Sequence, residues 1–195
     1  MTVYTNFKEL ASQEVEGQDY RIRIELRNPQ VLIMAPHGGR IEPTTDVIAE
    51  AIGGIDYSFY SFEGLKADSR VFHIESYLFD EPRALQAVER ADIVVTVHGQ
   101  IDQKDEFVMV GGLHENLRSE IIRQLEAAGF QTRSPTEGLT GTDPMNICNR
   151  GKSMQGVQLE ISRKVRDILR KDKDHLRVFA DAVRKAIQIY LQRKD

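Results

Sequence analysis

Four residues of this sequence have the side-chain chemistry of a hydrolytic zinc site. His37 and His98 each end an apolar run, Glu42 follows His37 by five residues, and Glu160 lies in the apolar segment GVQLEIS. A catalytic zinc is held by about three His, Asp or Glu side chains and keeps one position open for water. We therefore expect His37, Glu42 and His98 to bind the metal. Glu160 would be the general base, taking a proton from the metal-activated water and returning it to the leaving nitrogen.

These residues depend on strands and helices that the hydrophobic pattern predicts. Alternating or continuous apolar runs predict seven strands, and amphipathic patterns bounded by turn residues predict four helices. The predicted strands are 19–26, 30–36, 57–64, 70–77, 92–99, 106–112 and 156–162, and the predicted helices are 43–54, 80–91, 114–129 and 174–192. Residues 138–151 are expected to form a loop.

Strands that alternate with helices indicate an α/β fold. We expect residues 1–195 to form a single catalytic domain, a three-layer αβα sandwich with a mixed, largely parallel sheet, because no linker or repeat divides the chain. Ligands of such sheets collect beyond the carboxyl ends of the strands. This rule selects His37, His98 and Glu160.

Composition excludes several classes of protein. The formal net charge of −4 and a pI near 5.8 argue against a general nucleic-acid binder. The single cysteine, Cys148, cannot form an internal disulfide. The amino-terminal segment has neither a signal peptide nor a membrane-spanning stretch, so we expect a soluble monomer made in the cytoplasm, without membrane partners.

A basic segment suggests an anionic substrate. Residues 149–173 contain eight Lys or Arg residues and three acidic residues, in a protein that is acidic overall. Guanidinium groups suit carboxylates. If Arg150 and Arg166 flank Glu160, they would hold an anionic substrate and stabilise an oxyanion.

Several blocks in order, among them APHGGRIEPTTDVIA, FHIESYLFDEP, VVTVHG, NICNRG and GVQLEISRKVR, resemble the phage-related poly-γ-glutamate hydrolases. These enzymes are similar to small zinc carboxypeptidases. The resemblance implies hydrolysis of γ-glutamyl amide bonds in poly-γ-glutamate, with one zinc ion per chain and action outside the cell after phage lysis. It matches His37, Glu42 and His98 to the metal ligands and Glu160 to the catalytic carboxylate.

The same resemblance suggests residues that hold substrate. Asn149 and Arg150 resemble the asparagine–arginine pair with which carboxypeptidase-like enzymes hold a substrate carboxylate, so Arg150 is assigned to both binding and catalysis. Arg166 and His73 are further candidates for substrate contact. Two departures are visible: the first ligands are five residues apart, where carboxypeptidases have three, and Glu75 replaces the threonine expected in HITS, which puts strict substrate specificity in question.

Each of these residues also has an ordinary structural interpretation. His37 and His98 could bond to loop carbonyls at strand ends, Glu42 could favour a helix start, and Glu160 could pair with an arginine. His73 could serve the core, and His114 and His175 could cap helices. Among functions, the alternatives are a metallo-amidase acting on N-acylglutamate or on peptidoglycan γ-glutamyl bonds, and a prophage remnant that binds anions without catalysis.

Overall fold

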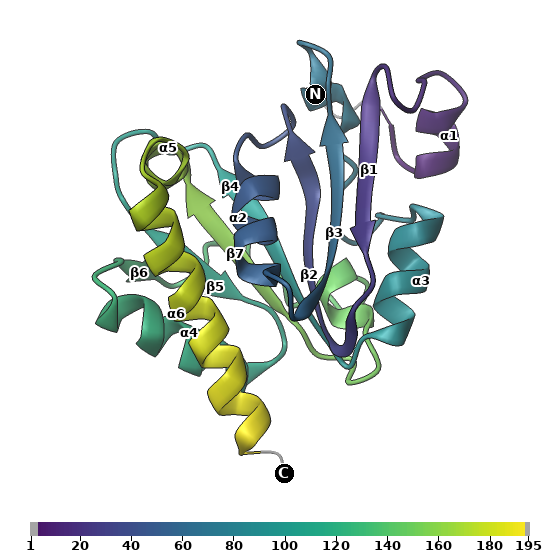
Figure 1. The fold of residues 1–195 in the computed structure, drawn as a ribbon. Helices are drawn as coiled ribbons and strands as arrows, with labels where there is room; N and C mark the ends of the chain where they lie inside the picture. Colours follow the sequence, from purple (N-terminus) through teal and green to yellow (C-terminus); the bar gives the residue numbers. More distant parts are fainter. Residues whose placement is uncertain (1–3, 194–195) are drawn as a thin grey trace.

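The computed structural model describes residues 4–193, and at its centre lies one seven-stranded sheet (Figure 1). The strand order is β1-β3-β2-β4-β7-β5-β6. The strands are β1 (Tyr20–Glu25), β2 (Asn28–Gly39), β3 (Tyr57–Gly64), β4 (Ile93–Gln100), β5 (Val108–Gly111), β6 (Thr132–Arg133) and β7 (Val157–Ser162). The four central strands β3, β2, β4 and β7 are parallel, whereas β1 runs antiparallel to β3 and β5 runs antiparallel to β7. The predicted mixed, largely parallel sheet is confirmed.

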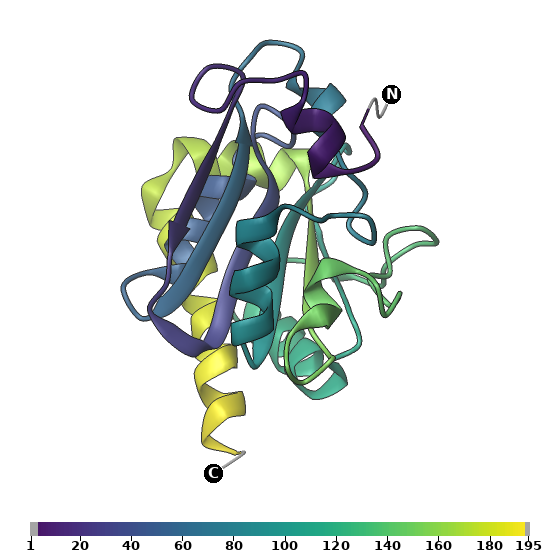
Figure 2. The same ribbon diagram turned by 90° about the vertical axis from the view of Figure 1, so that its right-hand side faces the viewer.

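Helices cover both faces of the sheet, which gives the three layers that the sequence predicts (Figures 1 and 2). The helical elements are α1 (Phe7–Ala11), α2 (Thr45–Gly53), η1 (Ser69–Phe72), α3 (Pro82–Arg90), α4 (Glu115–Ala127), η2 (Ile147–Arg150), α5 (Arg163–Lys171) and α6 (Lys173–Gln192). Buried side chains of α2, α4, α5 and α6 form one hydrophobic cluster, and those of α1, η1, α3 and η2 form the cluster on the other face. No helix within residues 4–193 is long and apolar enough to cross a membrane.

One predicted strand is wrong. Residues 70–77 form the end of the 3-10 helix η1 followed by irregular chain. Their apolar residues do face the core, since Phe72 and Ile74 are buried. They pair with no strand of the described sheet, however, and β1 occupies the outer side of β3. The alternation of apolar residues in 70–77 therefore reflects burial against the core and not pairing in the sheet.

Several short or strongly charged elements were not predicted. The sequence pattern missed α1 and β6, and it assigned the residues of η2 to a loop. It also missed α5, whose sequence RKVRDILRK offers few apolar residues. This helix begins immediately after β7, where the Ser162 side chain accepts a hydrogen bond from the Val165 N–H and so caps it.

The chain reverses its direction of travel across the sheet between β2 and β4. It leaves β2 through α2 to reach β3 on one side, and then passes through α3, on the opposite face, to reach β4 on the other side of β2. Pairing between β2 and β4 extends only from Val31 and Ile93 to Met34 and Thr96. Beyond that point the two strands no longer pair. In α/β sheets such a switch point opens a crevice at the carboxyl ends of the strands.

Candidate metal and catalytic site

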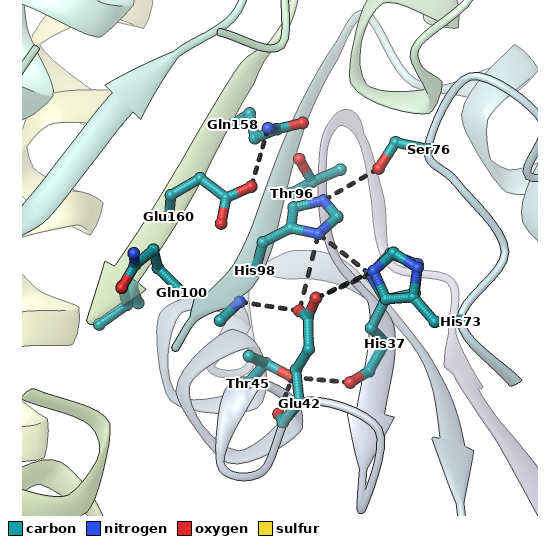
Figure 3. A network of polar contacts seen from close by, with 12 residues as sticks. His37, Glu42, Thr45, His73, Ser76, Thr96, His98, Gln100, Gln158 and Glu160 are labelled. Atoms are coloured by element: carbon teal, nitrogen blue, oxygen red, sulfur yellow. Dashed lines mark hydrogen bonds and ion pairs between the residues drawn. The ribbon is translucent and has the colours of Figure 1, made fainter. Parts of the chain in front are cut away.

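Three of the predicted residues meet at this switch point (Figure 3). His37 lies near the end of β2, His98 lies near the end of β4, and Glu42 lies in the turn between β2 and α2. The His37 Nδ1 atom is 3.3 Å from Glu42 Oε1 and 3.2 Å from His98 Nδ1. Glu42 Oε2 is 3.7 Å from His98 Nδ1. Two imidazole nitrogens and a carboxylate thus face one small volume.

These donor atoms fit a divalent cation of the size of zinc. Ligands about 2.0–2.1 Å from a tetrahedral zinc lie roughly 3.3–3.4 Å from one another, close to the separations in this cluster. The His37 Nε2 atom lies 2.8 Å from the Ile74 carbonyl oxygen, to which it donates, and this leaves the Nδ1 lone pair free. A backbone carbonyl that accepts from the other ring nitrogen commonly fixes the tautomer of a metal-binding histidine.

The protonation states also suit a cation. Burial lowers the pKa of His98 to about 3, so its imidazole is neutral at pH 7. Burial alone would raise the pKa of Glu42, but the charge and hydrogen bond of a doubly protonated His37, with a hydrogen bond from His73, hold it well below its usual value. A bound cation would take the place of the His37 Nδ1 proton and interact with the same carboxylate. The His98 imidazole is therefore neutral and the Glu42 carboxylate is ionised. Together with the imidazole of His37, these are ligand types that zinc prefers.

His73 is a rival for the third ligand position. His37, Glu42 and His73 also have donor atoms within 4.8 Å of one another, and His73 Nε2 is 3.3 Å from Glu42 Oε1. Its ring, however, stacks on His37 with centroids 3.9 Å apart and planes 27° apart. The lone pairs of stacked rings run side by side, whereas the His98 ring is inclined by 66° to His37 and their nitrogens face each other. Geometry therefore favours His98, and places His73 at the rim.

The turn that carries Glu42 is fixed by close backbone approach. A Cβ atom on Gly38 would lie 2.6 Å from Ser61 Oγ and 2.9 Å from Asp46 Cβ, and Gly39 has a φ of 64°. The Glu42 N–H then donates to the His37 carbonyl over 2.9 Å. At the far end of the side chain, Glu42 Oε2 accepts a hydrogen bond of 2.7 Å from the Gly99 N–H. This turn brings the carboxylate back over the end of β2.

Glu160 lies beside this cluster on the neighbouring strand β7, in register with His98. Gln158 Nε2 donates to Glu160 Oε1 over 3.0 Å, and Asn146 Nδ2 donates to Gln158 Oε1 over 2.8 Å. Burial, and then the charge of Glu42, raise the pKa of Glu160 well above its usual value, against the opposing charge of Arg166. Within residues 4–193 no ion pair of 4.0 Å or less includes Glu160. The interpretation of Glu160 as a structural ion-pair partner therefore has no support.

The predicted pair of arginines does not flank Glu160 symmetrically. The buried Arg166 guanidinium donates to the carbonyl oxygens of Ile161, Pro43 and Gln100 over 3.1, 2.5 and 3.0 Å. It thus ties the ends of β7 and β4 to the turn after Glu42. Its charge acts on Glu160, and its hydrogen bonds go to backbone carbonyls, so the substrate contact expected of Arg166 stays a prediction.

Asn149 and Arg150 are engaged elsewhere. The buried Asn149 amide donates to the Gly141 and Asp143 carbonyls, and its Oδ1 accepts from the Leu113 and Gly156 N–H groups. Arg150 Nη1 donates to the Phe79 carbonyl over 3.0 Å. These bonds join loops around η2, and the substrate-binding roles expected for both residues stay predictions.

Sequence reasoning missed the groups that orient the cluster. Gln158 supports Glu160, and Ser76 Oγ lies 3.5 Å from His98 Nε2. The sequence contained a signal for Gln158, because residues two apart on a strand share a face and Gln158 is two residues before Glu160. Glu75 is half exposed, with Oε1 3.8 Å from His73 Nδ1 at the rim. His114 accepts from the Leu117 N–H at the start of α4, as expected of a capping residue.

Comparison with known proteins identifies relatives along nearly the whole chain. The family described as poly-gamma-glutamate hydrolase matches residues 4–185. YmaC of Bacillus subtilis (strain 168) is 39% identical over 168 residues, which is 84% of this chain and 70% of that protein. A solved bacteriophage poly-gamma-glutamate hydrolase superposes with a TM-score of 0.91 at 32% identity, over 98% of this chain and 99% of that one. A zinc-free, apo structure of YndL gives a TM-score of 0.89 at 32% identity, over 96% and 98% of the two chains.

Proposed function

Because the chain belongs to the poly-gamma-glutamate hydrolase family, we propose that it hydrolyses the γ-glutamyl amide bonds of poly-γ-glutamate with a bound zinc ion. His37, Glu42 and His98 would hold one zinc per chain. The observation that carries this proposal is the convergence of their three donor atoms, 3.2–3.7 Å apart, at the switch point of the sheet. YndL is a relative of similar fold, and its apo structure is the zinc-free form, which supports zinc as the metal.

Glu160 would supply the acid–base chemistry. Zinc in such a site acts as a Lewis acid and lowers the pKa of a coordinated water to about 7. The Glu160 carboxylate takes a proton from the attacking water while the water oxygen bonds to the carbonyl carbon. The carbon–nitrogen bond then breaks, and Glu160 returns the proton to the leaving nitrogen. The products are a free γ-carboxylate and an amine, so one water molecule accounts for all atoms.

The position of Glu160 suits this role for two reasons. Its strand neighbour is His98, so the carboxylate lies next to the proposed metal ligands. Its raised pKa makes it a stronger base than an ordinary carboxylate, and the Gln158 amide holds one of its oxygens in place. A base placed and tuned in this way typically contributes about 10²–10⁴-fold to the rate.

We also propose that the substrate enters over the rim formed by His73 and Glu75. Both side chains are partly exposed, and the remaining cluster residues are more deeply buried. In this arrangement Arg166 holds the Glu42 turn and does not contact the polymer.

The similarity to a bacteriophage poly-gamma-glutamate hydrolase supports a role outside the producing cell, against polymer released or displayed by a host.

The test replaces Glu160 by glutamine. Glu160→Gln keeps the shape and the Gln158 contact but cannot accept the proton, so we expect normal zinc content and a loss of poly-γ-glutamate hydrolysis of at least 10²-fold. His37→Ala should lose the zinc itself. Exposed Glu137→Gln is the matched control and should behave as wild type. Full activity of Glu160→Gln would overturn the mechanism.

The products separate the proposed activity from its alternatives. A falling chain length of poly-γ-glutamate identifies a polymer hydrolase and also distinguishes internal from terminal cleavage. Release of a small acid from N-acylglutamate, or cleavage of a peptidoglycan γ-glutamyl bond without action on the polymer, would identify a different metallo-amidase. Zinc binding without any hydrolysis would identify a binding protein.

A further inference from the structure

A second cleft adjoins the turn that carries Glu42, near the end of β2 and the last turn of α5. It has a volume of about 930 Å³ and is lined by residues from the turn after β2, from the segment 67–71, and by Arg170 of α5. This volume lies within the roughly 300–1,000 Å³ typical of ligand sites.

Three arginines give this cleft its charge. Arg40, Arg70 and Arg170 line it and are exposed, and none of them forms an ion pair or a side-chain hydrogen bond with residues 4–193. Two carboxyl groups, Asp46 and Asp68, also line the cleft. The three arginines therefore outnumber the two carboxylates in the lining.

The cleft is continuous with the proposed site along the chain. Its lining residues Arg40 and Pro43 lie on either side of Glu42, and Val71 precedes His73 by two residues. Glu42 and His73 are themselves in contact, with Oε1 and Nε2 3.3 Å apart. Consecutive Cα atoms are about 3.8 Å apart, so the cleft lies within about two residues' length of Glu42 and His73. A polymer that enters over His73 would therefore have its next residues near the cleft.

We propose that this cleft is a subsite for the poly-γ-glutamate chain, in which Arg40, Arg70 and Arg170 bind the free α-carboxylates of residues next to the cleaved bond. The inference rests on the proposed function and extends it to substrate length. A γ-linked chain carries one free carboxylate on each residue, and the planar guanidinium fork matches a carboxylate with two parallel hydrogen bonds. Unpaired arginines around an open cleft are suited to such a ligand.

The test removes the three charges together. We compare R40A/R70A/R170A with wild type on long poly-γ-glutamate and on a γ-linked glutamate trimer, which is too short to fill both sites. Each exposed ion pair contributes modestly, so three predict about a tenfold rise in KM for the long polymer. The kcat for that polymer should stay within about twofold, and KM for the trimer should change far less. The matched control is K8A/R90A/K185A, which removes three exposed positive charges elsewhere.

Binding gives a second measurement that does not depend on turnover. Fluorescent long poly-γ-glutamate is titrated onto Glu160→Gln with and without the three arginine substitutions, at low and high salt. We expect about tenfold weaker binding without the arginines, and a smaller effect of salt on what remains.

The outcomes separate this proposal from the proposed function. Equal KM and equal binding of the triple variant and the control would overturn the subsite. If wild type hydrolyses neither substrate, the proposed function fails, and the binding titration still decides the cleft. Arginine-dependent binding of double-stranded DNA with equal affinity would also overturn the assignment to polyglutamate.

Discussion

Replacing Arg166 by methionine tests whether this residue positions the zinc site or binds the substrate. The guanidinium is buried and donates to the carbonyls of Pro43, Gln100 and Ile161, which lie on three separate segments. Methionine fills a similar volume but makes none of these bonds. The turn that carries Glu42 would then lose its tie to the ends of β4 and β7.

The size of the effect follows from the three carbonyls. A buried acceptor left without a partner costs about 1–3 kcal/mol; the Ile161 carbonyl is buried and those of Pro43 and Gln100 are partly buried, so the three together give roughly 3–6 kcal/mol. Part of this cost is offset, because methionine carries no charge that must be buried. Burial of the Arg166 guanidinium is unfavourable, as its lowered pKa indicates. We expect a loss of about 3–5 kcal/mol in the free energy of unfolding, or about 6–20 °C in the midpoint for a chain of this length.

The assay combines thermal unfolding with zinc titration. Arg166→Met should unfold earlier and bind zinc more weakly, and Arg166→Lys should fall between it and wild type because an ammonium cannot reach all three carbonyls. Arg163→Met, which removes an arginine from a partly exposed ion pair with Asp167, is the control and should be nearly neutral. If Arg166→Met keeps wild-type stability and zinc affinity and changes only KM, Arg166 binds substrate and the positioning role is wrong.

Three further predictions follow from separate features. Cys148, whose pKa burial raises to about 12, should resist iodoacetamide at pH 8 in the native protein and react at once when unfolded; rapid native labelling would contradict its burial. Gly156→Ala should cost about 3 kcal/mol in urea unfolding, because a Cβ there would lie 1.9 Å from the Cys148 carbonyl oxygen; an unchanged midpoint would refute this close approach. Glu75→Thr should lower KM for poly-γ-glutamate a few-fold at unchanged zinc content by removing a negative charge at the rim, and an unchanged or higher KM would argue against entry there.

The sequence predicted most of the sheet because its strands are strongly patterned. The residues around His37, His98 and Glu160 stand at the ends of apolar runs, and parallel strands bring such ends to one edge. The five-residue gap to Glu42 spans Gly38 and Gly39, which form the tight turn that brings the carboxylate back to the end of β2.

Other features of the site depend on contacts that no local pattern contains. The strand order, and with it the switch point between β2 and β4, follows from packing of α2 and α3 on opposite faces. Arg166 reaches Pro43 across 123 residues of chain, and the sequence offered only its charge. His73 was assigned to a strand because buried neighbours at alternate positions imitate the period of a sheet.

The most direct test of the zinc site compares the zinc content of purified His98→Ala and His73→Ala. If His37, Glu42 and His98 hold the metal, His73→Ala should retain about one zinc per chain, as wild type does, and His98→Ala should retain almost none. Each variant is checked for native circular dichroism, so that loss of metal is not confused with loss of fold. The opposite pattern, with zinc lost from His73→Ala and kept in His98→Ala, would contradict the proposed ligand set.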